Sequence, residues 1–157
     1  MKFLCDEMLQ RLGSWLRAAG YDTLIEQTSE DDYSLLKLAI SEDRILLTCD
    51  KELMGLRKAY QYARLLSCDS LTDSVTSLTR QVPVNWLYRP FSRCLKCNTE
   101  LTRATQQQQD TALDKPSELT EAERRTARYC PTCQKVYWDG SHVTRMRHKL
   151  ESWQSQR

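Results

Sequence analysis

The sequence of 157 residues lacks any long apolar run. Its longest wholly hydrophobic stretches contain only a few residues, far fewer than the ~20 that a helix needs to cross a bilayer. The first residues also include Asp6 and Glu7, where a secretion signal requires its apolar stretch. We therefore expect a protein without membrane contact and with a cytoplasmic location.

Histidine is scarce as well, since the sequence contains only His142 and His148, both near its end. No grouping of histidine with serine or cysteine therefore suggests nucleophilic catalysis. The net charge of +2 is too small to indicate a nucleic-acid partner by itself. Its distribution is more informative: residues 1–92 carry 11 basic and 13 acidic side chains, whereas residues 93–157 carry 12 and 8. An acidic front and a basic back suggest two modules with different roles.

Four of the seven cysteines form two tight pairs, each with two residues between its members. Cysteines at this spacing can both face one metal ion when the backbone turns between them as a knuckle, and two knuckles supply the four sulfur ligands of a tetrahedral zinc site. Four thiolates leave no open coordination position, so we expect a structural zinc ion. Reduced cysteines that merely fill space are the weaker alternative. The expected zinc ligands are Cys94, Cys97, Cys130 and Cys133.

The other three cysteines are Cys5, Cys49 and Cys68. A disulfide scaffold is typical of short secreted chains, and this sequence shows no secretion signal. We expect these three side chains to pack as small apolar residues at strand ends.

The first 81 residues alternate short apolar runs with segments of helical period, which predicts a mostly parallel sheet flanked by helices. Strands are expected at 3–5, 22–25, 45–48 and 63–67. Helices are expected over 8–20, from near residue 32, with helical character over 51–62, and at 70–80. Residues 82–92, with Pro83 and Pro90, read as a linker packed against the first module.

A zinc ribbon with a basic C-terminal tail is expected over residues 93–157. Between the two cysteine pairs, the polar run from Gln106 to Gln109 and the following Asp110, Asp114, Lys115 and Pro116 predict an exposed loop. After Gly140, basic residues alternate with apolar ones, which favours a basic amphipathic helix. The predicted organisation is therefore a module over 1–81, a linker over 82–92 and a ribbon over 93–157.

Aspartates follow three of the predicted strands. The carboxyl ends of parallel strands meet at one edge of a sheet, where ligands bind. Carboxylates gathered there repel each other, and a divalent cation removes that cost. Single aspartates at such places more often cap the helix that follows, so the metal site rests on the whole set. The expected Mg²⁺ or Mn²⁺ ligands are Asp6, Asp32 and Asp50, with Glu7 and Asp69 as further candidates.

Taken together in this order, the motifs resemble the Mut7-C family, a PIN-like ribonuclease domain followed by a zinc ribbon. The resemblance rests on the residues 2–9 KFLCDEML, 15–17 WLR, 20–22 GYD, 44–48 RILLT, the paired cysteines, 136–138 VYW and 140–142 GSH. It implies a PIN-like α/β fold and metal-dependent cleavage of RNA, with the family's acidic positions at Asp6, Asp32 and Asp50. Family members usually carry an arginine where this sequence has Cys49.

We therefore expect a metal-dependent ribonuclease that uses an acidic Mg²⁺ or Mn²⁺ site, a structural zinc ion, and single-stranded or structured RNA as its partner. The alternative is a non-catalytic adaptor whose zinc ribbon binds RNA or a protein. Basic side chains of the ribbon and tail would contact phosphates without reading the base sequence. These are Arg124, Arg125, Arg128, Arg145, Arg147 and Lys149.

Overall fold

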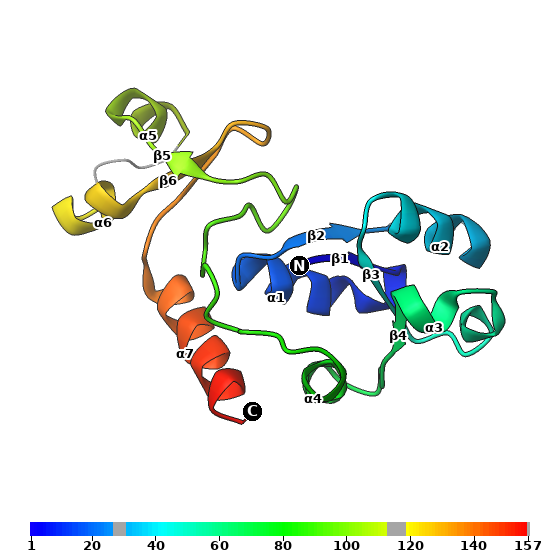
Figure 1. Ribbon diagram of the computed structural model, residues 1–157. Helices are drawn as coiled ribbons and strands as arrows, with labels where there is room; N and C mark the ends of the chain where they lie inside the picture. The colour runs from blue at the N-terminus through cyan, green and yellow to red at the C-terminus, as the bar shows by residue number, and fades with distance from the viewer. Residues whose placement is uncertain (27–30, 113–118, 157) are drawn as a thin grey trace.

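A computed structural model describes residues 1–26, 31–112 and 119–156 of the chain. Within them, four parallel strands form one sheet in the order β2-β1-β3-β4 (Figure 1). Parallel strands need crossover connections, and helices supply them here. The strands are β1 (Lys2–Cys5), β2 (Asp22–Ile25), β3 (Ile45–Thr48) and β4 (Ala63–Leu65). The predicted α/β fold is confirmed.

One face of the sheet is covered by α1 (Gln10–Ala18), which follows a single 3₁₀ turn, η1 (Glu7–Leu9), and by α4 (Leu71–Gln81). Alternate strand residues such as Phe3 and Leu47 point into this face and are fully buried. Residues at two-residue intervals share a face of a strand. The apolar residues of β1 and β3 therefore divide between two cores, one on each face of the sheet.

The opposite face carries α2 (Asp32–Ser41), η2 (Leu53–Gly55) and α3 (Ala59–Tyr62). Leu4 and Leu46, the neighbours of the residues above, are fully buried there. The helical character expected over 51–62 is therefore divided into a 3₁₀ turn and one short helix. Lys58, with φ of 74°, breaks the helical path between them.

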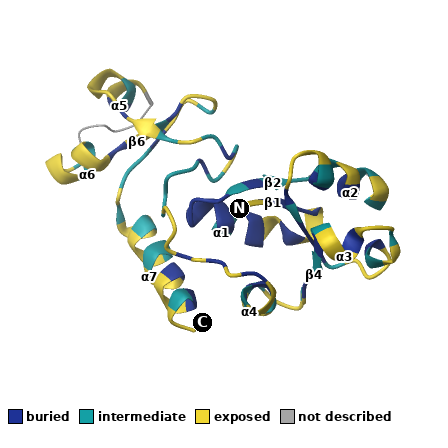
Figure 2. Cartoon of the chain, viewed as in Figure 1, coloured by how far each residue is buried: buried dark blue, intermediate teal, exposed yellow. Residues whose placement is uncertain are grey.

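The C-terminal part begins with a three-stranded antiparallel sheet, β5 (Thr102–Arg103), β6 (Arg128–Cys130) and β7 (Lys135–Tyr137). Two short helices, α5 (Gln106–Ala112) and α6 (Glu121–Thr126), lie between β5 and β6 and are mostly exposed (Figure 2). The predicted amphipathic helix is present as α7 (Ser141–Ser155).

The exposed loop predicted between the cysteine pairs is wrong for Gln106–Ala112, which is helical. Gln109 is only 4% exposed, and its amide donates to the backbone oxygens of Ala104 and Arg124 at 3.3 and 3.1 Å. Two hydrogen bonds from one buried amide nitrogen make this polar sequence part of a packed unit. Asp114, Lys115 and Pro116 of the same prediction lie outside the described residues.

The C-terminal helix α7 packs against the first module. Leu150 and Trp153 are buried in the same core as Phe3 and Leu47. The ring of Trp153 lies 4.9 Å from that of Trp15 on α1. The linker is buried in this core too, through Val84 and Trp86 among others. The chain therefore leaves the first module, forms the ribbon and returns to complete the core it left.

None of the helices in the described part of the chain is both long and apolar enough to span a membrane.

The turn after α1 predicts that adding one methyl group at Gly20 strongly lowers the stability of the protein. Gly20 has φ of 99°, and a Cβ at this position would overlap the backbone oxygen of Arg89 in the linker. We expect Gly20→Ala to lower the free energy of unfolding by at least about 2 kcal/mol, since both backbone strain and overlap must be relieved. Urea denaturation measures this change.

Gly55→Ala is the matched control, because nothing lies within 4 Å of a Cβ placed there. Its effect should stay within about 1 kcal/mol. Equal effects of the two substitutions would contradict the close approach of the linker to α1.

Candidate metal centres and nucleic-acid interface

The four predicted zinc ligands lie together. All four sulfur atoms are within 4.8 Å of one another. The sulfurs of Cys94 and Cys133 are 3.9 Å apart, and those of Cys97 and Cys130 are 3.4 Å apart. Tetrahedral ligation with Zn–S bonds of about 2.3 Å places the sulfurs about 3.8 Å from one another. The cluster therefore fits zinc in both donor chemistry and spacing.

Each cysteine pair is followed by a residue in the left-handed backbone region. Asn98 has φ of 69° and Gln134 has φ of 54°. Their amides donate to the carbonyls of Cys94 and Cys130 at 2.9 and 2.8 Å. These bonds close the two knuckles in the same way and turn both sulfurs of each pair inward.

Two groups near the cluster favour bound thiolates. Burial opposes ionisation of Cys97, but hydrogen bonding to Thr99 outweighs it and lowers the pKa of this thiol to about 6. The hydroxyl of Tyr137 lies 3.1 Å from Cys94 Sγ and can donate to it. Such outer contacts orient metal ligands and stabilise their charge.

The first knuckle is fastened to the N-terminal module by Arg17 of α1. This side chain is 6% exposed, and it donates to the carbonyls of Leu95 and Lys96 at 3.0 and 2.9 Å. It also donates to Thr23 of β2 at 2.8 Å. Burial lowers the pKa of Arg17, and the nearby sulfurs act in the opposite direction, led by Cys5 and followed by Cys94. Thiolates bound to zinc would thus supply the negative charge that a buried guanidinium needs.

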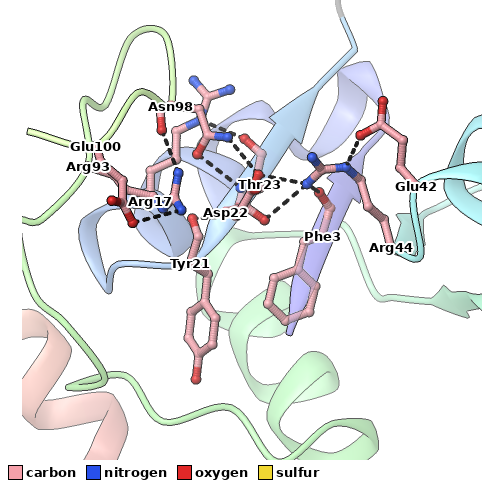
Figure 3. Close-up of polar contacts among 10 residues, drawn as sticks. All are labelled: Phe3, Arg17, Tyr21, Asp22, Thr23, Glu42, Arg44, Arg93, Asn98 and Glu100. Carbon is pink, nitrogen blue, oxygen red and sulfur yellow. Dashed lines mark hydrogen bonds and ion pairs between the residues drawn. The ribbon is translucent and has the colours of Figure 1, made fainter.

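Asn98 makes a second connection to β2 (Figure 3). Its oxygen accepts from the Thr23 amide at 3.0 Å, and its nitrogen donates to Asp22 Oδ1 at 2.8 Å. Arg44 binds the same carboxylate oxygen at 2.7 Å. Burial opposes ionisation of Asp22, but the bonds from Arg44 and Asn98 outweigh it and hold the pKa of this carboxyl below its usual range. The knuckle therefore supplies a hydrogen-bond partner for the Thr23 amide on the outer edge of β2.

These contacts predict that loss of zinc weakens the whole protein. We expect about one zinc ion per chain by elemental analysis, and loss of that zinc in Cys130→Ser. Because the zinc-bound knuckle holds Arg17 and Asn98 in place, the urea midpoint of the first module should also fall, as followed by the fluorescence of Trp15 and Trp153.

Cys68→Ser is the control for the zinc content alone, since it removes a cysteine outside the cluster and should retain the metal. Zinc near zero in freshly purified, reduced wild-type protein would disprove the assignment.

The acidic side chains lie at the carboxyl edge of the parallel sheet. Asp6 directly follows β1, and Asp50 lies two residues beyond the end of β3, the neighbouring strand. Asp6 Oδ2 accepts from the backbone amide of Cys49 at 3.2 Å, so the two strand ends are tied together. Asp50 Oδ1 accepts from the Glu52 amide at 2.7 Å.

Asp6 places a carboxylate in a buried position. The residue is 8% exposed, and its second oxygen, Oδ1, is buried without a hydrogen-bond partner in the part of the chain that the structure describes. It precedes η1 but makes no side-chain capping bond to it. A buried carboxylate oxygen without a partner is costly unless a cation compensates it.

The helix-cap alternative holds for Asp31 and not for Asp32. Asp31 accepts from the amide and hydroxyl of Ser34 at 3.0 and 2.9 Å, and the amide bond first of all lowers its pKa. Asp32 is the first residue of α2 and lies within the field of the other acids. Burial raises the pKa of Asp32, and neighbouring carboxylates raise it further, in the order Asp50, Glu52, Asp31 and Asp6.

The two remaining acidic candidates are placed differently. Glu7 is exposed in the first turn after Asp6. Asp69 lies beyond the end of β4, where its Oδ2 accepts from the hydroxyl of Ser67 at 3.1 Å. The role of these acids as cation ligands stays a prediction.

Cys49 and Cys68 form a disulfide, with their Cα atoms 6.1 Å apart. The expectation that both merely pack as apolar residues is therefore wrong, although both do contact the core. For Cys5, which is free and fully buried, it is confirmed. The bond joins the ends of β3 and β4, so it fastens the residues next to Asp50 and Asp69. The spacing of two strand-end cysteines after adjacent strands was the signal that could have indicated it.

The disulfide closes a segment with a sequence separation of 19 residues. Restricting the unfolded chain in this way stabilises a protein by about 3 kcal/mol. In non-reducing buffer we expect Cys49→Ser to lower the free energy of unfolding by about that amount. Reductant should produce the same loss in the wild type and no further loss in the variant. Mass spectrometry that finds Cys49 and Cys68 as free thiols in the untreated protein would contradict the bond.

The predicted RNA-binding residues fall into two neighbouring hollows and one other place. Arg125, Arg128 and Arg147 line a hollow between the ribbon and α7. Arg145 and Lys149 line a second hollow between α7 and α1. Arg124 instead pairs with Asp110 of α5 at 3.5 Å.

Sequence reasoning missed several residues of this region. Arg17 is charged yet buried on the packed face of α1, and Arg11 and Arg103 line the two hollows. A charge inside the apolar sequence Trp15 to Ala19 was the one available sign for Arg17. Arg11 and Arg103 stand in no local pattern that sets them apart.

A parallel α/β sheet with acidic side chains at one edge, joined to a four-cysteine ribbon, is typical of a nuclease-like protein with associated zinc. The family model described as the Mut7-C RNAse domain matches residues 1–150, and the chain belongs to this family. A human protein described as "Exonuclease mut-7 homolog" is 30% identical over 103 residues. The match covers 63% of this chain and 12% of the human protein, so the chain spans a small part of that relative's length. No solved structure matches the chain.

Proposed function

We propose that the protein is a metal-dependent ribonuclease that hydrolyses phosphodiester bonds of RNA at the acidic edge of its parallel sheet. Asp6, Asp32 and Asp50 would hold one or two Mg²⁺ or Mn²⁺ ions there. The observation that carries this proposal is the buried Oδ1 of Asp6, which has no hydrogen-bond partner in the described residues. Membership in the Mut7-C RNAse domain family supports RNA as the substrate.

The chemistry of the donor set fits a hard divalent cation. Mg²⁺ and Mn²⁺ prefer carboxylate oxygens and keep several waters, which an open strand edge allows. Asp6 and Asp50 each spend one oxygen on a backbone amide and keep the other for a ligand. A bound cation at this place would supply an activated water and offset negative charge on the phosphate and the leaving oxygen.

The chain's own contribution is to hold the carboxylates in place before the substrate arrives. The Cys49 amide fixes Asp6, and the Glu52 amide fixes Asp50, whose own amide donates to Thr48 Oγ1 at 3.0 Å. The pKa of Asp32 lies above its ordinary value, so protons compete with a cation there. Cation binding should therefore weaken as the pH falls toward that pKa.

The zinc ribbon would assist by binding the RNA backbone, because its arginines lie in a hollow beside α7. The human relative carries the name of an exonuclease, which supports a nuclease for this chain as well. We also propose a cytoplasmic location, in keeping with an RNA substrate.

Asp50→Asn tests the proposal. Asparagine keeps an oxygen for the Glu52 amide but loses the charge, so the fold should persist while cleavage falls at least about 100-fold. The measurement is cleavage of a labelled single-stranded RNA in the presence of Mn²⁺ or Mg²⁺, with circular dichroism as the test of folding.

Asp31→Asn is the matched control, because it removes a neighbouring charge from a residue that caps α2 and asparagine caps equally well. It should leave cleavage within about threefold of wild type. RNA binding that survives in Asp50→Asn, together with no cleavage by the wild type under either metal, would favour the adaptor instead.

A further inference from the structure

A basic hollow lies between the ribbon and α7, with a volume of about 570 Å³. This volume falls within the range of about 300–1,000 Å³ typical of small-ligand sites. One carboxylate, Asp139, faces it. Five arginines also line it: Arg93, Arg103, Arg125, Arg128 and Arg147.

The floor of the hollow is built by strand register. Arg103 of β5 lies directly opposite Arg128 of β6, and Arg128 lies opposite Tyr137 of β7. Directly opposed residues of antiparallel strands point to the same side, so two guanidinium groups and one phenol ring form a row. Both arginines are exposed, and neither pairs with a carboxylate among the described residues.

Two like charges in this arrangement destabilise a sheet. The sequence could relieve the repulsion with an acid on the third strand, yet Tyr137 stands there. An anion that accepts from both guanidinium groups removes the repulsion, and phosphate is the anion that arginine pairs bind best. The row is therefore suited to a phosphate group from outside the chain.

Aromatic rings form another part of the wall. Phe91, Tyr137 and Trp138 line the hollow, and the Arg147 guanidinium lies 5.0 Å from the centre of the Phe91 ring. Phe91 has φ of 57°, a conformation that a bulky residue rarely adopts, and its amide donates to Ala18 at 2.7 Å. Rings and guanidinium planes are the surfaces on which unpaired bases stack, whereas a duplex keeps its bases inside.

A second hollow, of about 670 Å³, continues from the first. His142 and Met146, one turn apart on α7, line both hollows. The second hollow is basic as well, through Arg11, Arg145 and Lys149.

The second hollow reaches Asp69, beyond the carboxyl end of β4. Asp69 lines it and directly follows Cys68, whose disulfide partner Cys49 directly precedes Asp50. Arg11, on another wall, lies five residues after Asp6 in the sequence. The two hollows thus form one basic track along α7, from the ribbon toward the side of the sheet that carries the proposed cleavage site.

We infer that this track binds single-stranded RNA, with a phosphate on the Arg103–Arg128 pair and an unpaired base against the aromatic wall of the ribbon hollow. The inference rests on the proposed function for its choice of RNA. It adds that the substrate must be unpaired over the several nucleotides that span α7.

The test is binding of a fluorescently labelled 12-nucleotide single-stranded RNA to the zinc-loaded protein without added Mg²⁺ or Mn²⁺, measured by anisotropy. The double variant Arg103→Gln with Arg128→Gln should bind at least about tenfold more weakly. Its slope of log K against log salt should fall by about 0.7, because one phosphate contact of a single strand is lost. A blunt duplex of the same length should bind the wild type more weakly than the single strand does.

Arg57→Gln is the matched control, since it removes an exposed arginine from the opposite side of the parallel sheet. It should bind as the wild type does. The double variant should unfold at a temperature no lower than the wild type, because the repulsive pair is gone. Unchanged affinity in the double variant, duplex binding equal to single-strand binding, or no RNA binding at all would each overturn the inference.

This outcome is separate from that of the nuclease test. Tight binding that depends on Arg103 and Arg128, without cleavage under any metal, would disprove the ribonuclease and leave the track. Cleavage by the wild type, with binding and cleavage unchanged in the double variant, would disprove the track and leave the ribonuclease.

Discussion

One buried guanidinium joins the two halves of this protein. Arg17 leaves the packed face of α1 and reaches carbonyl oxygens of β2 and of the first zinc knuckle. Its three bonds satisfy three of its five N–H donors, but carbonyls carry no full charge, so thiolates bound to zinc in the knuckle would supply compensation. The knuckle and the α/β module are therefore joined in the structure, although they are separate in the sequence. The position of the ribbon, and with it the basic track, follows from this contact.

The two ends of the track carry charges of opposite sign. At the sheet edge, Asp6 and Asp50 accept hydrogen bonds from backbone amides. Burial and then the neighbouring carboxylates raise the pKa of Asp32. In the ribbon, Arg103 and Arg128 face each other across two strands. Each cluster is unfavourable alone and becomes favourable with a ligand of opposite sign. Such unrelieved charge is common where a protein binds, since stability is given up there for function.

The sequence predicts well what depends on local spacing. The four zinc ligands are found from two gaps of two residues, and the strands of the parallel sheet are found from short apolar runs. The helix at Gln106–Ala112 was missed because its stability comes from Gln109, whose partners Ala104 and Arg124 lie outside the helix. The Arg103–Arg128 pair was missed for a similar reason, because strand register brings together residues that are 25 positions apart in the sequence. Contacts of this kind have no local pattern.

The return of α7 to the first core has a consequence for synthesis of the protein. Trp86 of the linker is fully buried, its amide donates to Gln154 Oε1 at 2.8 Å, and its ring lies 5.0 Å from that of Trp153. A nascent chain on the ribosome exposes this tryptophan and Trp15 of α1 until residues 150–154 emerge. The first 81 residues can form their sheet earlier, but part of their hydrophobic surface stays exposed to solvent until α7 packs against it. Translation through the whole ribbon, and capture of its zinc, falls within that interval, so chaperones have a defined window in which to act.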